Sequence, residues 1–376
     1  MNKRILLTGG GSGGHIYPLL AVADELKKLA SADAEFYYLG PKSLFFEEFK
    51  KRNIVTSPII SSKLRRYFDL ANIIDTPKFF ISLIQALIKI YFIMPDVVFS
   101  KGGTGSLSIV MATRFYSIPV IIHESDSVPS LTNRLAAHFA KRIGVSFKKT
   151  VNLFPKNKTA FVGNPIREDF YRDWKGQSEA KMLFGFDAKE PLVLILTGSQ
   201  GSTRINGFIF DHLEELLKTF QILHQAGEVN LKDGKAISES IFKETESDLQ
   251  NRYKIMGFIS SEEMKNALSA ADVVVSRAGA GAIYEIAVSG KPVILIPLSE
   301  SANDHQRENA YEYSKTGAGM VIEESNLGIN MLLTEIKNIL KSEEQKNKAK
   351  LGSREFVKPD AAKLIAQEIL ILAKNS

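Results

Sequence analysis

"LLTGGGSGGHIYPLLAVADEL", residues 6–26, joins a short apolar run to a glycine-rich turn and then to a helical pattern of apolar residues. Five of the six residues 9–14 are glycine, and His15 stands where the helical pattern begins. A glycine-rich turn between a buried strand and a helix lets backbone N–H groups approach phosphate oxygens, and the helix N-terminus adds a favourable dipole. The stretch therefore predicts a strand–turn–helix unit that opens a doubly wound α/β domain and binds a phosphate.

The spacing of Gly9, Gly11 and Gly14 matches the GxGxxG pattern of dinucleotide-binding folds. That interpretation needs an acidic residue at the end of the second strand to bind the ribose, but this strand ends in "YYLGPK" (37–42) without one. An NTPase phosphate loop is also disfavoured, because no Gly-Lys-Ser/Thr follows the glycines. The turn is predicted to hold some other phosphate.

The chain has 376 residues, which is too long for one ordinary hydrophobic core and favours two domains. Hydrophobic residues make up 44% and charged residues 24%, as in ordinary globular proteins. The net charge of +6 is compatible with nucleic acid, an anionic membrane or a phosphorylated substrate. The sequence has no Cys, which excludes disulfides and thiolate metal sites and is compatible with a reducing compartment.

Short apolar runs alternate with helical patterns in two similar halves, separated by the turn-rich segment 161–169. Buried parallel strands are predicted at 4–9, 35–40, 96–103, 119–124 and 142–147, and then within 191–202, 220–227, 253–258, 272–279 and 292–298. Helical patterns include 18–30 and 359–374. We expect two Rossmann-like domains facing a cleft, 1–164 and 165–358, with a C-terminal helix at 359–376 that packs back across the junction.

Four glycine-rich loops follow predicted strands, two in each half: "GGGSGGH" (9–15), "KGGTGS" (101–106), "TGSQGS" (197–202) and "SRAGAGAIYE" (276–285). Together they predict a nucleotide diphosphate on one side and a second phosphorylated molecule on the other. Glu285 suits a bidentate contact with ribose hydroxyls; alternatively, it is a first-turn residue that stabilises the helix dipole.

Further motifs follow in a fixed order: "HESDSVPSLTNR" (123–134), "VGNPIRED" (162–169), "ILHQAG" (222–227) and "DHQRENA" (304–310). With the four loops, they resemble the MurG family of bacterial peptidoglycan glycosyltransferases over nearly the whole chain. The resemblance implies a GT-B fold and inverting, metal-independent transfer without a cofactor. It implies UDP-N-acetylglucosamine as donor and the 4-hydroxyl of undecaprenyl-diphosphate-linked N-acetylmuramyl-pentapeptide as acceptor. It also implies peripheral attachment to the cytoplasmic side of the bacterial plasma membrane, contacts with cell-wall synthesis proteins and no nucleic acid.

Two sets of binding residues follow from the resemblance. The donor is expected at Ser12, Gly13, Gly14, Asp126, Arg167, Ser199, Gln200, Ile259, Ala280, Gly281, Glu285 and Gln306. The acceptor diphosphate is expected at Gly13, Gly14, His15, Gly103 and Thr104. Arg167 and Ser199 are expected to contact the departing diphosphate. Gln306, beside Asp304 and Arg307, is expected to bind sugar hydroxyls, and Ile259 to offer backbone groups to uracil.

Removal of the acceptor proton requires a base, for which His15, His123 and Asp126 are candidates. A histidine at a helix entry has its pKa lowered by the dipole and is neutral at neutral pH. His15 can alternatively bind the acceptor diphosphate or cap the helix, and His123 with Glu124 can alternatively order the loop 125–133. The resemblance does not separate the three candidates.

The sequence departs from the family pattern at several positions. Ser125 and Asp126 replace the usual Gln-Asn, and an ionised Asp126 accepts hydrogen bonds but donates none. Thr104, Leu107 and Ser108 replace the Tyr, Gly and Pro of the second loop. Residues 210–252 are assigned no role.

The segment 63–94 combines basic residues with many large apolar ones. Lys63, Arg65, Arg66 and Lys78 are expected to contact an anionic membrane, with only 63–82 touching lipid and the rest serving as a core helix. The longest apolar stretch, 79–94, is expected to be too short to span a bilayer. The N-terminal residues do not resemble a signal peptide.

Two other functions remain compatible with the loops. One is a different reaction on the same fold, either UDP-N-acetylglucosamine 2-epimerisation or glycosyl transfer to diacylglycerol. The other is a non-catalytic scaffold that binds a nucleotide sugar, which only the Ser125–Asp126 departure favours.

Overall fold

The computed structural model describes residues 3–30, 33–43, 45–61, 71–198, 200–244, 247–299, 301 and 304–374. The chain divides into two compact units: unit 1 comprises Met1–Glu168 with Lys358–Ser376, and unit 2 comprises Asp169–Val357. The boundary between the units therefore falls after Glu168, whereas the sequence analysis expected it after residue 164.

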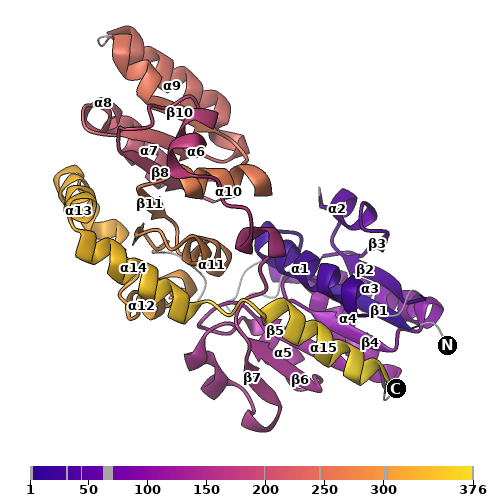
Figure 1. The fold of residues 1–376 in the computed structure, drawn as a ribbon. Coiled ribbons are helices and arrows are strands. Elements are labelled where there is room, and N and C mark those ends of the chain that lie inside the picture. Colours follow the sequence, from indigo (N-terminus) through magenta and orange to yellow (C-terminus); the bar gives the residue numbers. More distant parts are fainter. Residues whose placement is uncertain are drawn as a thin grey trace. The chain divides into compact units, whose positions relative to one another are not determined.

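Unit 1 is built on a parallel sheet of seven described strands in the order β3-β2-β1-β4-β5-β6-β7 (Figure 1). The strands are β1 (Arg4–Thr8), β2 (Glu35–Gly40), β3 (Val55–Pro58), β4 (Val97–Ser100), β5 (Val120–Glu124), β6 (Arg142–Val145) and β7 (Thr159–Phe161). The helices are α1 (Gly13–Leu29), α2 (Phe46–Lys50), α3 (Ala71–Ile93), α4 (Ser106–Phe115), α5 (Leu131–Ala136) and α15 (Ala361–Lys374), with short 3₁₀ turns η1 (Lys148–Leu153), η2 (Lys156–Lys158) and η3 (Glu168–Tyr171), the last crossing into unit 2.

Strand β1 is buried on both faces, which explains its continuous apolar run. Because side chains alternate along a strand, Ile5 and Leu7 belong to one core while Leu6 belongs to the other. The first core also contains residues of α1 and α15, such as Leu26 and Ile369. Helix α15 thus packs against α1 in unit 1, as predicted for the C-terminal helix.

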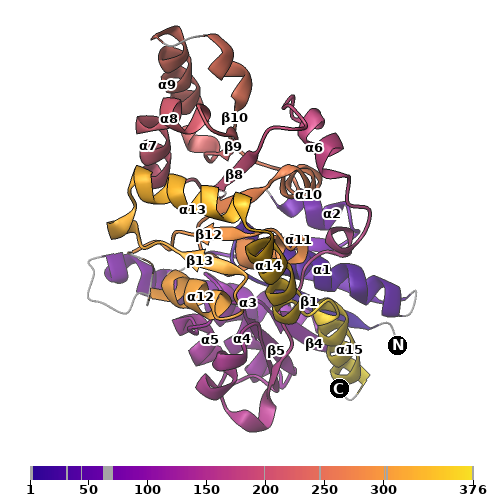
Figure 2. The ribbon, with the colours of Figure 1, turned by 60° about the vertical axis from the view of Figure 1, so that its left-hand side comes forward.

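Unit 2 has a parallel sheet of six described strands in the order β10-β9-β8-β11-β12-β13; Figure 2 shows β12 and β13 side by side. The strands are β8 (Leu192–Leu196), β9 (Gln221–Gln225), β10 (Tyr253–Met256), β11 (Val273–Ser276), β12 (Val293–Leu295) and β13 (Gly319–Val321). The helices are α6 (Gln177–Leu183), α7 (Thr203–Asp211), α8 (Leu213–Leu217), α9 (Leu231–Glu244), α10 (Ser261–Ala270), α11 (Ala280–Ser289), α12 (His305–Ser314), α13 (Ile329–Lys341) and α14 (Glu343–Phe356), with 3₁₀ turns η4 (Glu228–Asn230), η5 (Ser247–Arg252) and η7 (Glu324–Asn326).

Every predicted strand is present, but β3, β7 and β13 were not predicted. All three are short strands at sheet edges whose residues are largely half-buried or exposed, so they lack a buried apolar run. Helix α1 begins at Gly13 rather than at residue 18, which places His15 in its first turn.

The strand order of each sheet reverses at one point, between β1 and β4 in unit 1 and between β8 and β11 in unit 2. Doubly wound sheets bind ligands outside the carboxyl ends of the strands at this switch point. The four glycine-rich loops are the loops that follow these four strands. The fold therefore brings them together in pairs, one pair in each unit.

Candidate active site

The unit-1 edge, defined as the loops after β1, β4 and β5, is held together by close backbone contact. The N–H of Gly10 donates to the carbonyl oxygen of Gly102 at 2.8 Å. Gly103 has a φ of +86°, and a Cβ there would lie 2.8 Å from Gly10 Cα and 2.9 Å from His15 Nε2. Only glycine fits both the conformation and the space, so the two loops meet beside the His15 ring.

His15 is half-buried in the first turn of α1, and its Nδ1 lies 2.8 Å from Ser12 Oγ. Burial, followed by the positive charge of Lys101, lowers the pKa of His15 to about 4, against a smaller opposing effect of Asp126. The imidazole is therefore neutral at neutral pH, as expected, but the causes are burial and the neighbouring cation rather than the helix dipole that the sequence suggested. Its Nε2 faces Gly103 of the second loop.

The glycines at the start of α1 leave the helix N-terminus accessible. Gly14 is exposed, and a Cβ at this position would meet no atom within 4 Å. Gly13 is buried beside Tyr17. The first N–H groups of a helix have no intrahelical partner, so this backbone can bind an anion. Thr104 is half-buried, and its backbone N lies within 3.3 Å of a Cβ built on Gly10.

Lys101, which directly follows β4, was not identified from the sequence. Its side chain is buried, and Nζ contacts His123 Nδ1 at 2.5 Å, Asn164 Oδ1 at 3.1 Å and Ser125 Oγ. The missed signal was a lysine close behind the apolar residues 97–99, where burial is expected.

Both ring nitrogens of His123 are engaged. Nδ1 accepts from Lys101, and Nε2 lies 2.8 Å from the carbonyl oxygen of Gly163, to which it donates. Burial and the Lys101 charge lower the pKa of His123 well below its usual value. The residue is a neutral, fully buried histidine whose tautomer is fixed by these two contacts.

The Glu124 carboxylate orders the loop that follows β5. It accepts hydrogen bonds from the backbone N–H groups of Asp126 and Ser130, from Ser130 Oγ and from Asn133 Nδ2. Burial and the nearby Asp126 raise the pKa of Glu124. These contacts support the structural alternative for Glu124. Asp126 itself is half-buried and interacts electrostatically with both His15 and Lys101.

Arg167 lies in unit 1, with its guanidinium over the Tyr17 ring at 4.5 Å from the centroid. This stacking places the cation beside α1, since Tyr17 follows His15 by two positions in that helix.

Leu107 and Ser108, two of the residues that differ from the family pattern, lie in the core and not in the second glycine-rich loop. Both side chains are buried in α4, and Ser108 Oγ lies 2.7 Å from Ser82 Oγ of α3. These substitutions therefore act on helix packing.

The unit-2 edge, defined as the loops after β8, β11, β12 and β13, also depends on glycine. Gly201 has a φ of +79°, and a Cβ there would lie 2.3 Å from the Ala226 carbonyl oxygen. Gln200 is exposed in the same loop, and Ser199 lies outside the described residues. Behind this loop, His224 is buried between Asn206 Oδ1 at 3.1 Å and the Tyr253 hydroxyl at 2.9 Å.

Helix α11 begins at Ala280 after Gly279. A Cβ on Gly279 or on Gly281 would meet no atom within 4 Å, so the backbone at this N-terminus is accessible. The first turn contains no acidic residue, and Glu285 lies half-buried in the second turn. The alternative of a first-turn Glu that stabilises the dipole is therefore wrong.

Gln306 in the first turn of α12 is joined to the loop after β12. Its Oε1 accepts from the Leu298 N–H at 3.2 Å, and its own N–H donates to Ser301 Oγ at 3.3 Å. Asp304 precedes the helix with a φ of +54°. Arg307 instead pairs with Glu323 at 2.9 Å on the surface. Ile259 has a buried side chain immediately before the capping box of α10.

An ion pair missed from the sequence connects the loops of the unit-2 edge. Arg277 follows β11, and its guanidinium lies 2.5 Å from Glu324 after β13. Arg277 also donates to Ser202 Oγ at 2.6 Å, and Ser299 Oγ donates to Glu324 at 2.6 Å. Burial would raise the pKa of Glu324, but Ser299 and Arg277 hold it below its usual value. The position of Arg277 inside the fourth glycine-rich loop was the available signal.

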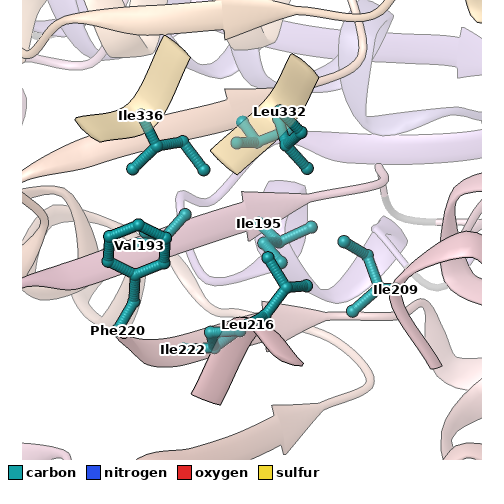
Figure 3. A pocket seen from close by; sticks show the side chains of 9 residues that line it. Val193, Ile195, Ile209, Leu216, Phe220, Ile222, Leu332 and Ile336 are labelled. Carbon is teal, nitrogen blue, oxygen red and sulfur yellow. The ribbon is translucent and has the colours of Figure 1, made fainter. Parts of the chain in front are cut away.

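A small cavity lies in the hydrophobic core of unit 2 (Figure 3). Its lining is entirely apolar: Val193, Ile195, Ile209, Leu216, Phe220, Ile222, Val275, Leu332 and Ile336. A space of this kind offers no polar group to a ligand and is a packing defect. Among the described residues, no group of His, Asp and Glu side chains is arranged to hold a metal ion.

Helix α3 presents an apolar face to solvent. The exposed side chains are Phe80, Ile81, Ile84, Ile88, Tyr91, Phe92 and, just beyond the helix, Met94. The opposite face is buried through Ser82, Ala86 and Ile90. The expectation that the helix beyond residue 82 serves as a core helix is wrong for this face, because exposed apolar side chains continue to the end of the helix. The expected contact of 63–82 with lipid stays a prediction.

The length of α3 corrects a second expectation. Asp75–Ile93 is long and apolar enough to cross a membrane by length and composition, because the helix begins before the apolar stretch 79–94. Lys78 is exposed, 4.0 Å from Asp75, whereas Lys89 donates to Ser57 and Pro58. Lys63, Arg65 and Arg66 lie outside the described residues.

Comparison with known proteins finds one family in both units. The N-terminal domain of glycosyltransferase family 28 matches residues 5–145, and the C-terminal domain of that family matches residues 192–365. A Clostridium kluyveri protein is 38% identical over 90% of this chain and 91% of its own. Its name is UDP-N-acetylglucosamine--N-acetylmuramyl-(pentapeptide) pyrophosphoryl-undecaprenol N-acetylglucosamine transferase. A Bacillus cereus protein with this name and the number 2 is 34% identical over 98% of this chain and 99% of its own.

Solved structures share the fold. MurG of Acinetobacter baumannii matches with a TM-score of 0.71 at 23% identity, covering 98% of this chain and 99% of its own. A UDP-GlcNAc 2-epimerase of Neisseria meningitidis matches with a TM-score of 0.67 at 13% identity, covering 98% and 100%. The predicted GT-B fold of two Rossmann-like domains is confirmed. Because a transferase and an epimerase share it, the fold alone does not decide the reaction.

Proposed function

The chain belongs to glycosyltransferase family 28, and on that premise we propose that it transfers N-acetylglucosamine from UDP-N-acetylglucosamine to undecaprenyl-diphosphate-linked N-acetylmuramyl-pentapeptide. The main observation behind the proposal is the share of the chain that matches these relatives. Relatives named for this reaction match at least 90% of the chain, and the family's two domain models match one stretch in each half, residues 5–145 and 192–365. The structural likeness to epimerases supports no second reaction, because it extends only to the fold.

The proposed reaction is a displacement at the anomeric carbon with inversion. The acceptor 4-hydroxyl forms a bond to C1 of N-acetylglucosamine while the bond from C1 to the diphosphate oxygen breaks. The electron pair leaves with UDP, and the hydroxyl proton passes to a base on the enzyme. The transition state therefore needs a proton acceptor on one side and stabilisation of negative charge on the other.

His15 is the proposed base. It is neutral, Ser12 Oγ can accept from its Nδ1–H, and Nε2 then carries a lone pair toward the second loop. The charge of Asp126 favours the imidazolium that forms. His123 is disfavoured, because its two nitrogens are occupied by Lys101 and Gly163.

The acceptor diphosphate is proposed to bind at the unit-1 edge. Backbone groups of Gly13, Gly14, Gly103 and Thr104 would surround it, since the helix N-terminus at Gly14 is open and the two loops meet at Gly103. Arg167, held against Tyr17, would add a delocalised positive charge near the diphosphates. Ser12 lies in the same loop.

UDP-N-acetylglucosamine is proposed to bind mainly at the unit-2 edge. The N-terminus of α11 at Ala280 and Gly281 would face its diphosphate. The remaining proposed contacts are Ser199 and Gln200 of the third loop, Glu285 for the ribose, Gln306 for the sugar and Ile259 for uracil. The proposed donor contacts from unit 1 are Ser12, Gly13, Gly14, Asp126 and Arg167.

The transfer assay decides the function. Purified protein is incubated with radiolabelled UDP-N-acetylglucosamine and a short-chain lipid-linked muramyl pentapeptide, with EDTA present. We expect one labelled disaccharide lipid per UDP released. Release of N-acetylmannosamine with UDP, or binding of UDP-N-acetylglucosamine without turnover, would contradict the proposal.

We further propose that the protein works as a peripheral enzyme on the cytoplasmic face of the bacterial plasma membrane, where its lipid substrate resides. The exposed face of α3 with Phe80, Ile84 and Ile88 supports an interfacial position, while its opposite face packs against α4 through Ser82 and Ser108. A spanning helix would lose that packing. Lys63, Arg65, Arg66 and Lys78 are proposed to contact anionic headgroups.

Sedimentation with phosphatidylglycerol vesicles tests this attachment. Ile84→Glu with Ile88→Glu should weaken binding by at least about tenfold, since each buried aliphatic side chain contributes about 1.5–3 kcal/mol. Arg65→Glu, Arg66→Glu and Lys78→Glu together should weaken it mainly at low salt. The matched control is Leu364→Glu, an exposed apolar residue of α15 in the same unit. Equal binding by the α3 variants and the control would refute the attachment.

A further inference from the structure

A chain of hydrogen bonds connects the core of unit 2 to the loop after β9. It begins at the Tyr253 hydroxyl, which lies 2.9 Å from Nδ1 of the buried His224. Nε2 of His224 lies 3.1 Å from Oδ1 of the buried Asn206 in α7. Asn206 Nδ2 in turn donates to the carbonyl oxygen of Ala226 at 2.9 Å. Both ring nitrogens of His224 are thus engaged within the protein, and the ring is not available to a substrate.

The last link fixes the direction of the whole chain. A backbone carbonyl only accepts hydrogen bonds, so the Asn206 amide turns its nitrogen to Ala226 and its oxygen to His224. Nε2 of His224 therefore carries the proton. Burial lowers the pKa of His224 to about 3, so Nδ1 has no proton near neutral pH and accepts from the Tyr253 hydroxyl. Every group donates toward Ala226, whose carbonyl has no proton to pass on, so the chain orients groups rather than transferring protons.

The carbonyl at the end of this chain lies against the third glycine-rich loop. Asn230 Nδ2 also donates to it, at 3.0 Å, and lies 3.5 Å from the carbonyl oxygen of Gln200 in that loop. Gly201 has a φ of +79°, and a Cβ there would collide with both the Ala226 carbonyl oxygen and Asn230 Nδ2. The loop therefore packs directly on a carbonyl that is held by two amide groups, Asn206 from the core and Asn230 from nearer the surface.

We propose that Asn206 is a positioning residue for the donor substrate. By holding the Ala226 carbonyl, it fixes the third glycine-rich loop in the conformation that binds the diphosphate of UDP, and Asn230 assists it from the outer side. A loop that is already ordered before its ligand arrives loses less conformational entropy on binding. The inference rests on the proposed function, because it takes this loop as part of the donor site. It assigns neither asparagine a contact with substrate.

A role in stability alone is the alternative, and Gln221 offers a matched comparison. Gln221 is also a buried amide, but it lies at the amino end of β9, whereas Asn206 contacts the loop at the carboxyl end. Its side chain accepts from the Asp187 N–H and donates to the carbonyl oxygens of Asp187 and Glu190. Asn206→Leu and Gln221→Leu thus each remove a buried amide, but only the first removes one that holds the third glycine-rich loop.

The two variants of the full-length protein are compared by thermal unfolding and by isothermal titration calorimetry with UDP. Both should lower Tm by about 5 °C, because each leaves buried polar groups without a partner. Asn206→Leu should also raise the Kd for UDP by about tenfold or more, whereas Gln221→Leu should keep it within about twofold of the wild type. In transfer kinetics, Asn206→Leu should raise the KM for UDP-N-acetylglucosamine and leave the KM for the lipid acceptor unchanged.

Asn230→Ala tests the same contact without opening the core, since Asn230 is half-buried. It should raise the Kd for UDP by about threefold and leave Tm within about 2 °C of the wild type. This variant decides the matter if Asn206→Leu does not fold, and an unchanged Kd in Asn230→Ala would then overturn the positioning role.

The other outcomes are equally distinct. An unchanged Kd in Asn206→Leu, or equal losses of UDP affinity in Asn206→Leu and Gln221→Leu, would overturn the positioning role. A wild type that binds UDP but transfers no N-acetylglucosamine would overturn the proposed function alone, because UDP binding still tests the loop. A wild type that binds no UDP would overturn both.

Discussion

The two sheet edges share one architecture and differ in how they hold charge. Each has glycine-rich loops beside the switch point of a parallel sheet, with glycines where any Cβ would collide with the neighbouring loop. At the unit-1 edge, the half-buried His15 and the buried Lys101 both have lowered pKa values. At the unit-2 edge, Arg277 and Glu324 form a buried ion pair with hydrogen-bond partners for both members.

This difference indicates a division of labour. A group whose pKa lies away from its usual value and near a neighbouring charge is suited to proton transfer. A buried pair with a depressed carboxyl pKa does not titrate near neutral pH and is suited to fixing loop geometry. We therefore expect unit 1 to perform the proton chemistry and unit 2 to bind the nucleotide sugar.

The largest effect is expected at His15. Replacing it with Ala should lower kcat by about 10²–10⁴-fold, the usual contribution of a general base, while the KM for the donor stays near the wild-type value. His138→Ala provides the control, because His138 is an exposed histidine of the same unit. Near-normal turnover of the His15→Ala enzyme would remove His15 from the chemical step.

A smaller and different effect is expected at Arg277. Its replacement by Met leaves Glu324 buried without its main cation, which typically costs about 3–5 kcal/mol of stability. The loops after β8, β11 and β13 should loosen, and UDP affinity measured by calorimetry should fall by about tenfold or more. Arg307→Met is the matched control, because its ion pair with Glu323 lies on the surface, where solvent screens the charges and such pairs contribute little. Unchanged UDP affinity in Arg277→Met would show that the pair does not position the donor loops.

The smallest effect concerns His224, which supports the unit-2 edge from the core. Burial lowers its pKa to about 3, below the usual value of 6.5 for the unfolded chain. The unfolded state thus takes up this proton first as pH falls, and unit 2 loses stability as pH drops from the unfolded value toward the folded one. The free energy of unfolding, measured by urea denaturation, should therefore fall less steeply with decreasing pH in His224→Gln than in the wild type. The two slopes should differ by about 1.4 kcal/mol per pH unit in this window. Identical slopes for the two proteins would mean that His224 takes up its proton in the folded state.

The sequence predicts the fold in most of its parts, because buried parallel strands leave a plain apolar signal. The strand β1 and the glycine-rich turn to α1 are recognisable from residues 6–26 alone. The edge strands β3, β7 and β13 are not recognisable, since a partly exposed strand of three or four residues has no distinctive pattern.

The candidate site also has parts that the sequence reveals and parts that it does not. Glycine-rich loops and His15 are visible in the sequence because their spacing is local. The Lys101 contacts with His123, Ser125 and Asn164 join positions up to 63 apart in the sequence, so periodicity gives no sign of them. The same holds for Arg277 and Glu324, which sequence reasoning did not connect. Burial of a charged residue depends on the packing around it, which composition and spacing do not describe.

The division of labour is tested most directly by measuring UDP affinity in the His15→Ala protein by isothermal titration calorimetry. If unit 1 performs the proton chemistry while unit 2 binds the nucleotide, the Kd for UDP should stay within about twofold of the wild-type value although transfer is lost. A loss of UDP affinity as large as the loss of turnover would contradict the division, because His15 would then belong to the donor site.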